Sequence, residues 1–148
     1  MIRTIINLSE ESREIRIYGV CPMKVPERRL AAAAELVVRL NNVLPFGHFD
    51  LDLDTAVIAM RTGIRIGRAD LDSEVFKHLL FLNWAAIDFS FPAIAAVLSG
   101  AMTPQEAIAM LEKDKQTEHD DAARGEDRNP NRPDFNDRIR RFTDFSNN

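Results

Sequence analysis

Hydrophobic and polar residues alternate in two stretches near the N-terminus, residues 2–8 and 13–21, which predicts two β-strands. A polar loop of hairpin length, Ser9-Glu10-Glu11-Ser12, separates them. Pairing Ile6 with Ile15, and Thr4 with Ile17, places the aliphatic side chains of both strands on one face. That face carries Ile2, Ile6, Leu8, Ile15 and Ile17, and the other carries Arg3, Glu14, Arg16 and Tyr18. We therefore predict a hairpin in this register.

A second pair of alternating stretches, His48–Leu53 and Val57–Ile66, predicts a second hairpin. A two-residue turn at Asp54-Thr55 pairs Phe49 with Met60 and Leu51 with Ile58, so that both apolar sets face one core. A shift by one residue would bring aspartates opposite core residues, which makes this register specific.

A helical pattern separates the two hairpins. Pro26 suits the first turn of a helix, and Pro45 marks its end. Between them, apolar residues recur at the three- and four-residue steps of one helix face. These residues are Leu30, Ala33, Val37, Leu40 and Leu44.

The segment from Leu71 to Leu111 predicts a long helix, a stop and a short second helix. Asp72 or Ser73 can cap its start. Two apolar rows then follow different sides of the helix. One contains Phe76, Leu80, Trp84, Ile87, Phe91, Ile94 and Leu98, and the other contains Val75, Leu79, Leu82, Ala86, Phe89, Ala93 and Ala96. Because a surface helix has a single apolar stripe, this helix is either central in its own domain or binds a partner with its second face.

Proline and glycine mark the boundaries within this segment. Pro92 cannot donate to the carbonyl of Asp88, so we expect a kink or break between them, with Ser90 or water satisfying that carbonyl. Gly100 suits a left-handed helix C-cap. Thr103-Pro104-Gln105-Glu106 combines a capping residue, a proline at the first helical position and a glutamate three residues after the threonine, which predicts a helix start.

These elements follow the order ββαββαα, which predicts an α+β domain over residues 1–112, an antiparallel sheet of two hairpins with helices packed on one face. Residues 113–148 have few apolar and many charged side chains, a composition typical of disorder. Within them Phe135, Ile139 and Phe142 share one helical face, so residues 134–143 form a candidate amphipathic helix. This tail either stays disordered, docks on the protein or its dimer mate, or binds a separate partner.

Composition limits the classes of function. A chain of 148 residues with 45% apolar residues fits one globular domain, and its net charge of −4 provides no basic surface for nucleic acid. One cysteine excludes an internal disulfide framework, and the N-terminus lacks the apolar core of a signal peptide, so we expect a cytoplasmic protein. Asp88 lies within the apolar helix, where a central Asp costs about 3 kcal/mol on membrane insertion, so we expect no membrane span.

Three aspartates, Asp50, Asp52 and Asp54, invite interpretation as a metal site. Alternate side chains on one strand face lie about 7 Å apart, too far to share a cation unaided. As a calcium loop the run fails, because Thr55 and Arg61 replace the required glycine and glutamate. We interpret these residues as a solvated strand face with Arg61 nearby.

Other reactive residues also lack a chemical pattern. The histidines, His48, His78 and His119, have no metal-ligand spacing, and Cys21 falls on a core-facing strand position. We therefore predict no catalytic, metal-binding or cofactor-binding residues. Asp88, a charge in an apolar helix, is a candidate for either a structural role at Pro92 or ligand binding.

Several motifs carry a resemblance to a known family. They are LNNVLPFGHFDLDLD at residues 40–54, Arg61-Thr62-Gly63-Ile64, Asp88-Phe89-Ser90-Phe91-Pro92, Val97-Leu98-Ser99-Gly100 and Thr103-Pro104-Gln105-Glu106-Ala107. Together they resemble the YbjN-domain proteins, described as putative bacterial sensory transduction regulators, over residues 1–112. The resemblance implies an α+β domain similar to type III secretion chaperones, commonly dimeric, with no catalytic residues to carry over.

We interpret the chain as a non-enzymatic regulatory or chaperone-like protein-binding module, and expect a homodimer with an unidentified protein partner. The candidate interaction residues are Leu79, Leu82 and Phe89 on the long helix and Phe135, Ile139 and Phe142 in the tail. One alternative is a small-ligand sensor or enzyme with a pocket near Asp88 and Trp84. Another is a structural or assembly partner that acts through the tail.

Overall fold

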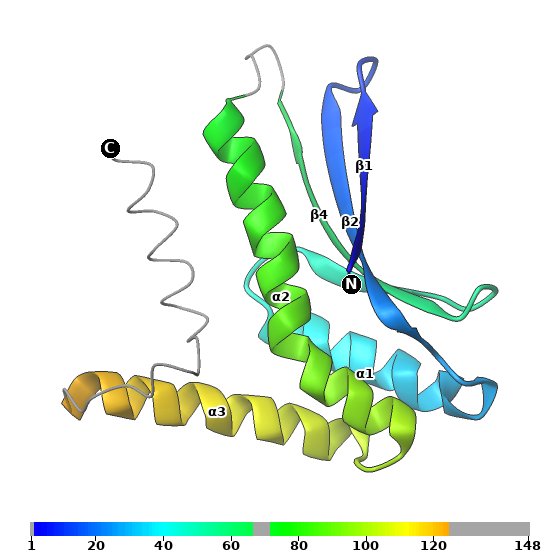
Figure 1. Ribbon diagram of the computed structural model, residues 1–148, viewed down its shortest axis with the longest axis vertical. Coiled ribbons are helices and arrows are strands. Elements are labelled where there is room, and N and C mark those ends of the chain that lie inside the picture. Colours follow the sequence, from blue (N-terminus) through cyan, green and yellow to red (C-terminus); the bar gives the residue numbers. More distant parts are fainter. Residues whose placement is uncertain (1, 67–71, 125–148) are drawn as a thin grey trace.

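The computed structural model describes residues 2–66 and 72–124, with side chains up to Asp114. Its elements, drawn in Figure 1, follow the predicted order ββαββαα, so the predicted α+β fold class is confirmed. They are β1 (Arg3–Ser9), β2 (Glu14–Lys24), a 3-10 turn (Glu27–Arg29), α1 (Leu30–Val43), β3 (His48–Asp52), β4 (Val57–Arg65), α2 (Ser73–Ser99) and α3 (Pro104–Arg124).

The four strands form one antiparallel sheet in the order β1-β2-β4-β3. The predicted register of the second hairpin is confirmed, with Phe49 opposite Met60 and Leu51 opposite Ile58. Its connection is longer than the predicted two-residue turn, since the strands end at Asp52 and Val57. The Asp52 carboxylate accepts hydrogen bonds from two backbone N–H groups inside this loop, which stabilises the wider turn.

The predicted register of the first hairpin is wrong by two residues. Ile6 lies opposite Ile17 and Ser9 opposite Glu14, so the turn spans residues 10–13 instead of 9–12 and ends at Arg13, which has a φ of 49°. A shift of two residues leaves every side chain on its predicted face, so the hydrophobic pattern cannot distinguish the two registers. The left-handed conformation of Arg13 and the hydrogen bond from Ser12 N to Ser9 Oγ, at 3.2 Å, accompany the observed turn.

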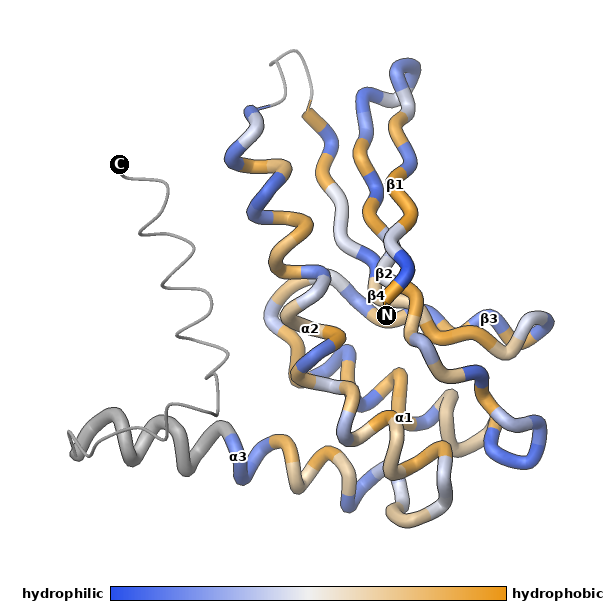
Figure 2. Tube along the Cα trace, viewed as in Figure 1, coloured by the Kyte–Doolittle hydropathy of each residue, from blue (hydrophilic) through white to orange (hydrophobic). Residues whose placement is uncertain are grey.

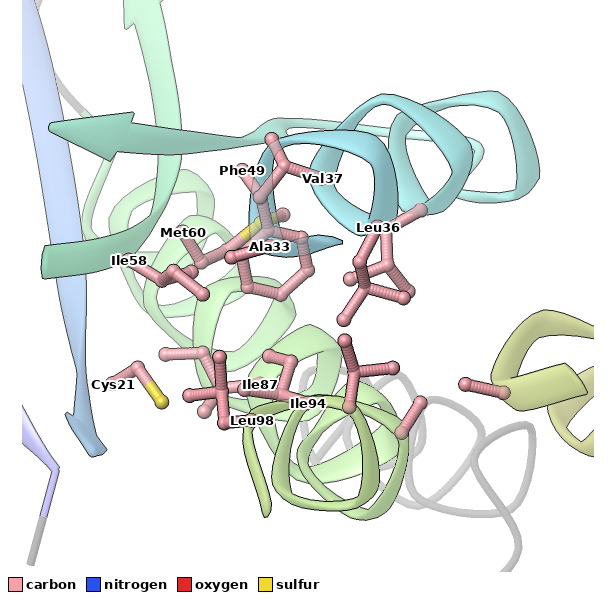
Figure 3. Packing of buried hydrophobic residues seen from close by; sticks show 14 of the residues in the cluster. Cys21, Ala33, Leu36, Val37, Phe49, Ile58, Met60, Ile87, Ile94 and Leu98 are labelled. Carbon is pink, nitrogen blue, oxygen red and sulfur yellow. The ribbon is translucent and has the colours of Figure 1, made fainter. Parts of the chain in front are cut away.

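The core lies between one face of the sheet and the helices. Figure 3 shows Phe49, Ile58 and Met60 of the second hairpin packed together with Ala33, Leu36 and Val37 of α1 and Ile87, Ile94 and Leu98 of α2. The predicted apolar stripe of α1 faces this core, with Leu30 half-buried and the other four residues buried. Cys21 is also buried, as predicted. Burial raises the pKa of its thiol, which disfavours the reactive thiolate.

Helix α2 is the central helix, because it packs on β2, β4, α1 and α3. It runs without interruption through Pro92, so a break there, one of the two predicted outcomes, is excluded. The expected role of Ser90 is also wrong, since its buried Oγ has no hydrogen-bond partner among the described residues. Core packing around the C-terminal half of α2 holds the helix together despite the missing backbone donor at Pro92.

Helix ends follow the predicted caps. Asp72 accepts a hydrogen bond from Glu74 N at 2.9 Å, and Gly100 has a φ of 89°. Thr103 N donates to the Glu106 carboxylate at 2.8 Å, while Glu106 N donates to Thr103 Oγ1 at 3.3 Å. Helix α3 is longer than predicted and extends past Glu112 to Arg124.

A buried amide joins α2 to the sheet. Asn83 Nδ2 donates to the carbonyls of Ile17 (3.1 Å) and Met60 (2.9 Å) and to Thr62 Oγ1 (3.3 Å). These bonds span β2 and β4 at the level where α2 crosses them, so Asn83 sets the position of the helix along the sheet.

Candidate protein-binding surface

Strand β4 extends beyond its neighbour β3, which leaves part of its edge open. The pairing of β3 begins at His48 opposite Arg61, whereas β4 continues to Arg65 and pairs with β2 from Ala59 to Arg65. Ile66 N donates to Arg13 O at 2.9 Å, so the alternation of an antiparallel ladder directs the N–H and C=O groups of Gly63 and Arg65 away from β2. Among residues 2–66 and 72–124, no partner bonds to these outward backbone groups at the edge of the sheet.

A side chain covers part of the outer edge of β3. Asn41 of α1 donates to Phe49 O at 3.0 Å and accepts from Phe49 N at 2.7 Å, so its amide takes the place of a neighbouring strand at this residue. This contact occupies the outward backbone groups of Phe49, next to the section where β4 extends beyond β3.

A pocket of about 370 Å³ lies beside the open edge of β4. On the helix side it is lined by Leu79, Leu82 and Thr62, and on the other side of the sheet by Arg16, Glu14, Arg61 and His48, with Phe46, Gly47 and Gly63 between them. The pocket therefore reaches both faces of the sheet around the edge of β4, with an apolar wall on one face and a charged wall on the other.

The charged wall is held by ion pairs. Arg61 Nε lies 2.8 Å from Asp50 Oδ2, and the Arg61 guanidinium also contacts His48. Arg16 Nη2 lies 2.8 Å from Glu14 Oε2. The hydrogen bond from Arg16 lowers the pKa of Glu14, and the same bond raises the pKa of Arg16. Both arginines are partly exposed, and each guanidinium has further N–H groups that can donate to a carboxylate from outside.

Gly63 is required at the open edge by its neighbour in β2. A Cβ at this position would lie 2.6 Å from Ile15 O, closer than real Cβ contacts allow. The unequal lengths of the alternating stretches 48–53 and 57–66 are the sequence signal that could have identified the overhang.

The sequence-predicted residues lie at different places. Leu79 and Leu82 line the pocket, whereas Phe89 is half-buried against the core. Asp88 is exposed on α2, and Trp84 donates from Nε1 to Thr4 Oγ1 of β1 at 2.9 Å. The tail candidates Phe135, Ile139 and Phe142 lie outside the described residues.

The aspartates of the second hairpin serve the protein's own structure. Asp50 pairs with Arg61, as the sequence indicates, and Asp52 holds the loop. The backbone N–H of Thr55 lowers the pKa of Asp52. Among the described residues, no group of three His, Cys, Asp or Glu side chains is placed to hold a metal ion.

By length and composition, α2 could cross a membrane, and it is the one such helix in the described part of the chain. Core helices pass the same test, and residues from Asn83 to Leu98 supply nine buried positions to the core of this fold.

The comparisons with known proteins identify a family for this chain. No curated protein and no solved structure matches the chain, so the expected similarity to type III secretion chaperones stays a prediction. The model of the YbjN family, described as a putative bacterial sensory transduction regulator, matches residues 2–96, from β1 to the last turn of α2. Because this match covers more than half of the sequence, the chain belongs to the YbjN family.

Proposed function

We propose that this protein is a non-enzymatic regulator that binds an extended segment of another protein along the open edge of β4. The observation that carries the proposal is the pair of outward backbone groups at Gly63 and Arg65 beside a two-sided pocket. The regulatory description of the YbjN family supports it.

A strand added at this edge would gain affinity from main-chain hydrogen bonds and specificity from alternate side chains. Side chains on the helix side would contact Leu79 and Leu82. Those on the opposite side would lie near Arg16 and Arg61. The pocket therefore favours a segment in which apolar residues alternate with acidic ones. Holding such a segment extended is also what a chaperone-like role requires.

The ion pairs and the buried thiol support a binding role over catalysis. Asp50, Arg61 and Cys21 are used within the fold, and burial disfavours the thiolate of Cys21. The proposal includes a cytoplasmic location, which the single cysteine supports. The alternative of a small-ligand sensor near Asp88 and Trp84 requires a buried charge, and Asp88 is exposed.

The test is selection from a random 12-residue peptide library displayed on phage, followed by affinity measurement with the full chain. The decisive variant is Arg65→Pro, which removes the outward N–H, and its matched control is Arg65→Ala, which keeps it. We expect the enriched peptides to alternate apolar and acidic residues. Their affinity should fall about tenfold or more in Arg65→Pro, because a main-chain hydrogen bond is lost. In Arg65→Ala the affinity should change little. Leu82→Asp should also abolish binding, because it places a charge in the apolar wall.

Amide hydrogen exchange provides a second readout. Binding should protect the amides of Gly63 and Arg65, since they gain partners only in the complex. Enriched peptides that bind Arg65→Pro as well as the natural sequence, or a library that yields no binder, would contradict the proposal.

A further inference from the structure

At the other margin of the sheet, no strand of the described part of the chain pairs with the outer edge of β1, and this edge is more apolar than the β4 edge. Since odd-numbered residues of β2 bond to β4, its even-numbered residues bond to β1. Their partners in β1 are Arg3, Ile5, Asn7 and Ser9. The N–H and C=O groups of Thr4, Ile6 and Leu8 therefore point away from the sheet.

The usual protections of an edge strand are missing from β1. It contains no proline or lysine, and its pairing with β2 is regular over its whole length. Three of its apolar side chains are exposed: Ile5 at 40%, Ile6 at 43% and Leu8 at 69%. Figure 2 shows apolar stretches, in orange, along β1 at the margin of the sheet. Exposed, regular and apolar edges of this kind pair with other strands.

We propose that β1 pairs antiparallel with β1 of a second copy of this chain, about a two-fold axis at Ile6, so that the two sheets form one continuous eight-stranded sheet. This inference concerns a different edge from the β4 site and does not depend on the function proposed for that site.

The register follows from the outward backbone groups. An axis at Ile6 places Ile6 opposite Ile6 of the second copy and Thr4 opposite Leu8, so every outward N–H and C=O of β1 gains a partner. An axis one residue away in either direction would pair Leu8 with Ile2 or Thr4 with Glu10, which lie outside β1. The axis at Ile6 is therefore the one that pairs all these groups within the bounds of β1.

The side chains are self-complementary in the same register. Thr4, Ile6 and Leu8 lie on the helix-facing side of the sheet, opposite Gly19, Ile17 and Ile15 of β2. Thr4 accepts the hydrogen bond from Trp84, whose side chain is 44% exposed. Leu8 of one copy would lie opposite Thr4 of the other, within reach of Trp84. The most exposed apolar side chain of β1 would thus cover the exposed indole.

Charge also favours the antiparallel arrangement. Arg3 lies at one end of β1, and Glu10 and Glu11 follow its other end. These three residues form no ion pair with another residue in the described part of the chain. Antiparallel pairing brings Arg3 of each copy to the acidic end of the other, whereas parallel pairing brings like charges together.

The first experiment measures the mass of the full chain by light scattering across micromolar concentrations, for the natural sequence, Ile6→Ala and Ile6→Lys. We expect a dimer for the natural sequence and for Ile6→Ala. In Ile6→Lys the dissociation constant should rise about tenfold or more, because the two lysines would lie directly opposite each other. Because Ile6 is exposed, the circular dichroism of each variant should match that of the natural sequence.

Cysteine cross-linking tests the register. Oxidation with diamide should link Ile6→Cys to itself, since directly opposed strand residues lie within disulfide distance. Leu8→Cys should not link to itself but should link to Thr4→Cys when the two proteins are mixed. Because the natural Cys21 is buried, the natural sequence serves as the control for background cross-linking.

A charge exchange is the third measurement. Arg3→Glu should weaken the dimer, and adding Glu10→Lys and Glu11→Lys to it should restore the dimer. A monomeric natural protein over the whole concentration range would overturn the proposal. A dimer unaffected by Ile6→Lys, or one in which Leu8→Cys links to itself, would place the interface elsewhere or in another orientation and would also overturn it.

Discussion

The side-chain amide of Asn83 occupies the space that a side chain at position 19 would need. A Cβ added at Gly19 would overlap Asn83 Oδ1 and Ile87 Cδ1. Asn83 Nδ2 donates to the carbonyl of Ile17 in the same strand, β2, and to the carbonyl of Met60 in the neighbouring strand, β4. Helix α2 therefore approaches the sheet closely at this one point. The absence of a side chain in β2 allows the buried amide in α2 to reach the backbone.

This fit predicts coupled stabilities. Gly19→Ala should lower the free energy of unfolding by about 1–3 kcal/mol, because it overpacks the contact. Asn83→Ala should lower it by about 1–3 kcal/mol, because it removes a buried donor. The double variant should lose less than the sum of the two by about 0.5–3 kcal/mol, since the shortened side chain at position 83 makes room for the new methyl group. Urea unfolding measures all three, and strictly additive losses would contradict the proposed fit.

The hydrogen bonds between Asn41 and Phe49 predict a specific loss of stability. Asn41→Ala should lower the free energy of unfolding by about 1–3 kcal/mol, because it leaves the N–H and C=O of Phe49 without their partner. The matched control is Asn42→Ala, at an exposed neighbouring position of the same helix, which should change stability much less. Equal losses of stability in the two variants would show that the hydrogen bonds between Asn41 and Phe49 do not stabilise the fold.

Pro92 predicts a gain of stability on substitution. It lies inside α2 and is exposed, so Pro92→Ala restores a helix donor without removing core packing. The free energy of unfolding should rise by up to about 3 kcal/mol. Pro104 provides the contrast, because it occupies the first position of α3, where proline fits, and it is buried. Pro104→Ala should therefore not raise stability. An equal change in the free energy of unfolding in both alanine variants would show that the position of the proline within its helix does not determine the effect.

The cap of α3 predicts a dependence of stability on pH. The backbone N–H and the hydroxyl of Thr103 lower the pKa of Glu106 below its ordinary value of 4.5. A carboxyl whose pKa is lowered by folding stabilises the protein above its unfolded pKa, and this contribution is lost as the pH falls through the folded pKa. Glu106→Gln should therefore be less stable than the natural sequence at neutral pH. The difference should shrink as the pH falls below 4.5.

Thermal unfolding of the two proteins across this pH range checks the prediction. Other carboxyls with lowered pKa values, such as Asp52 and Glu14, titrate in both proteins and cancel in the comparison. A difference that stays constant down to the lowest pH would exclude a charged cap.

The amino-acid sequence by itself determined the elements, their order and the faces that become buried. Alternation with a period of two identified the strands, and helical spacing with proline, glycine and capping residues identified the helices. These signals are local, because each depends on residues a few positions apart. They placed Phe49 opposite Met60 correctly, and they identified the cap formed by Thr103 and Glu106.

Only the tertiary structure decided the register of the first hairpin, the continuity of α2 and the two open edges of the sheet. A two-residue shift keeps the hydrophobic pattern unchanged, so the turn before Glu14 had to select the register. Packing against the sheet and two helices outweighs the helix-breaking tendency of Pro92. The edges at Ile6 and Gly63 depend on which strands are neighbours, and strand order is a long-range property that no short stretch of sequence contains.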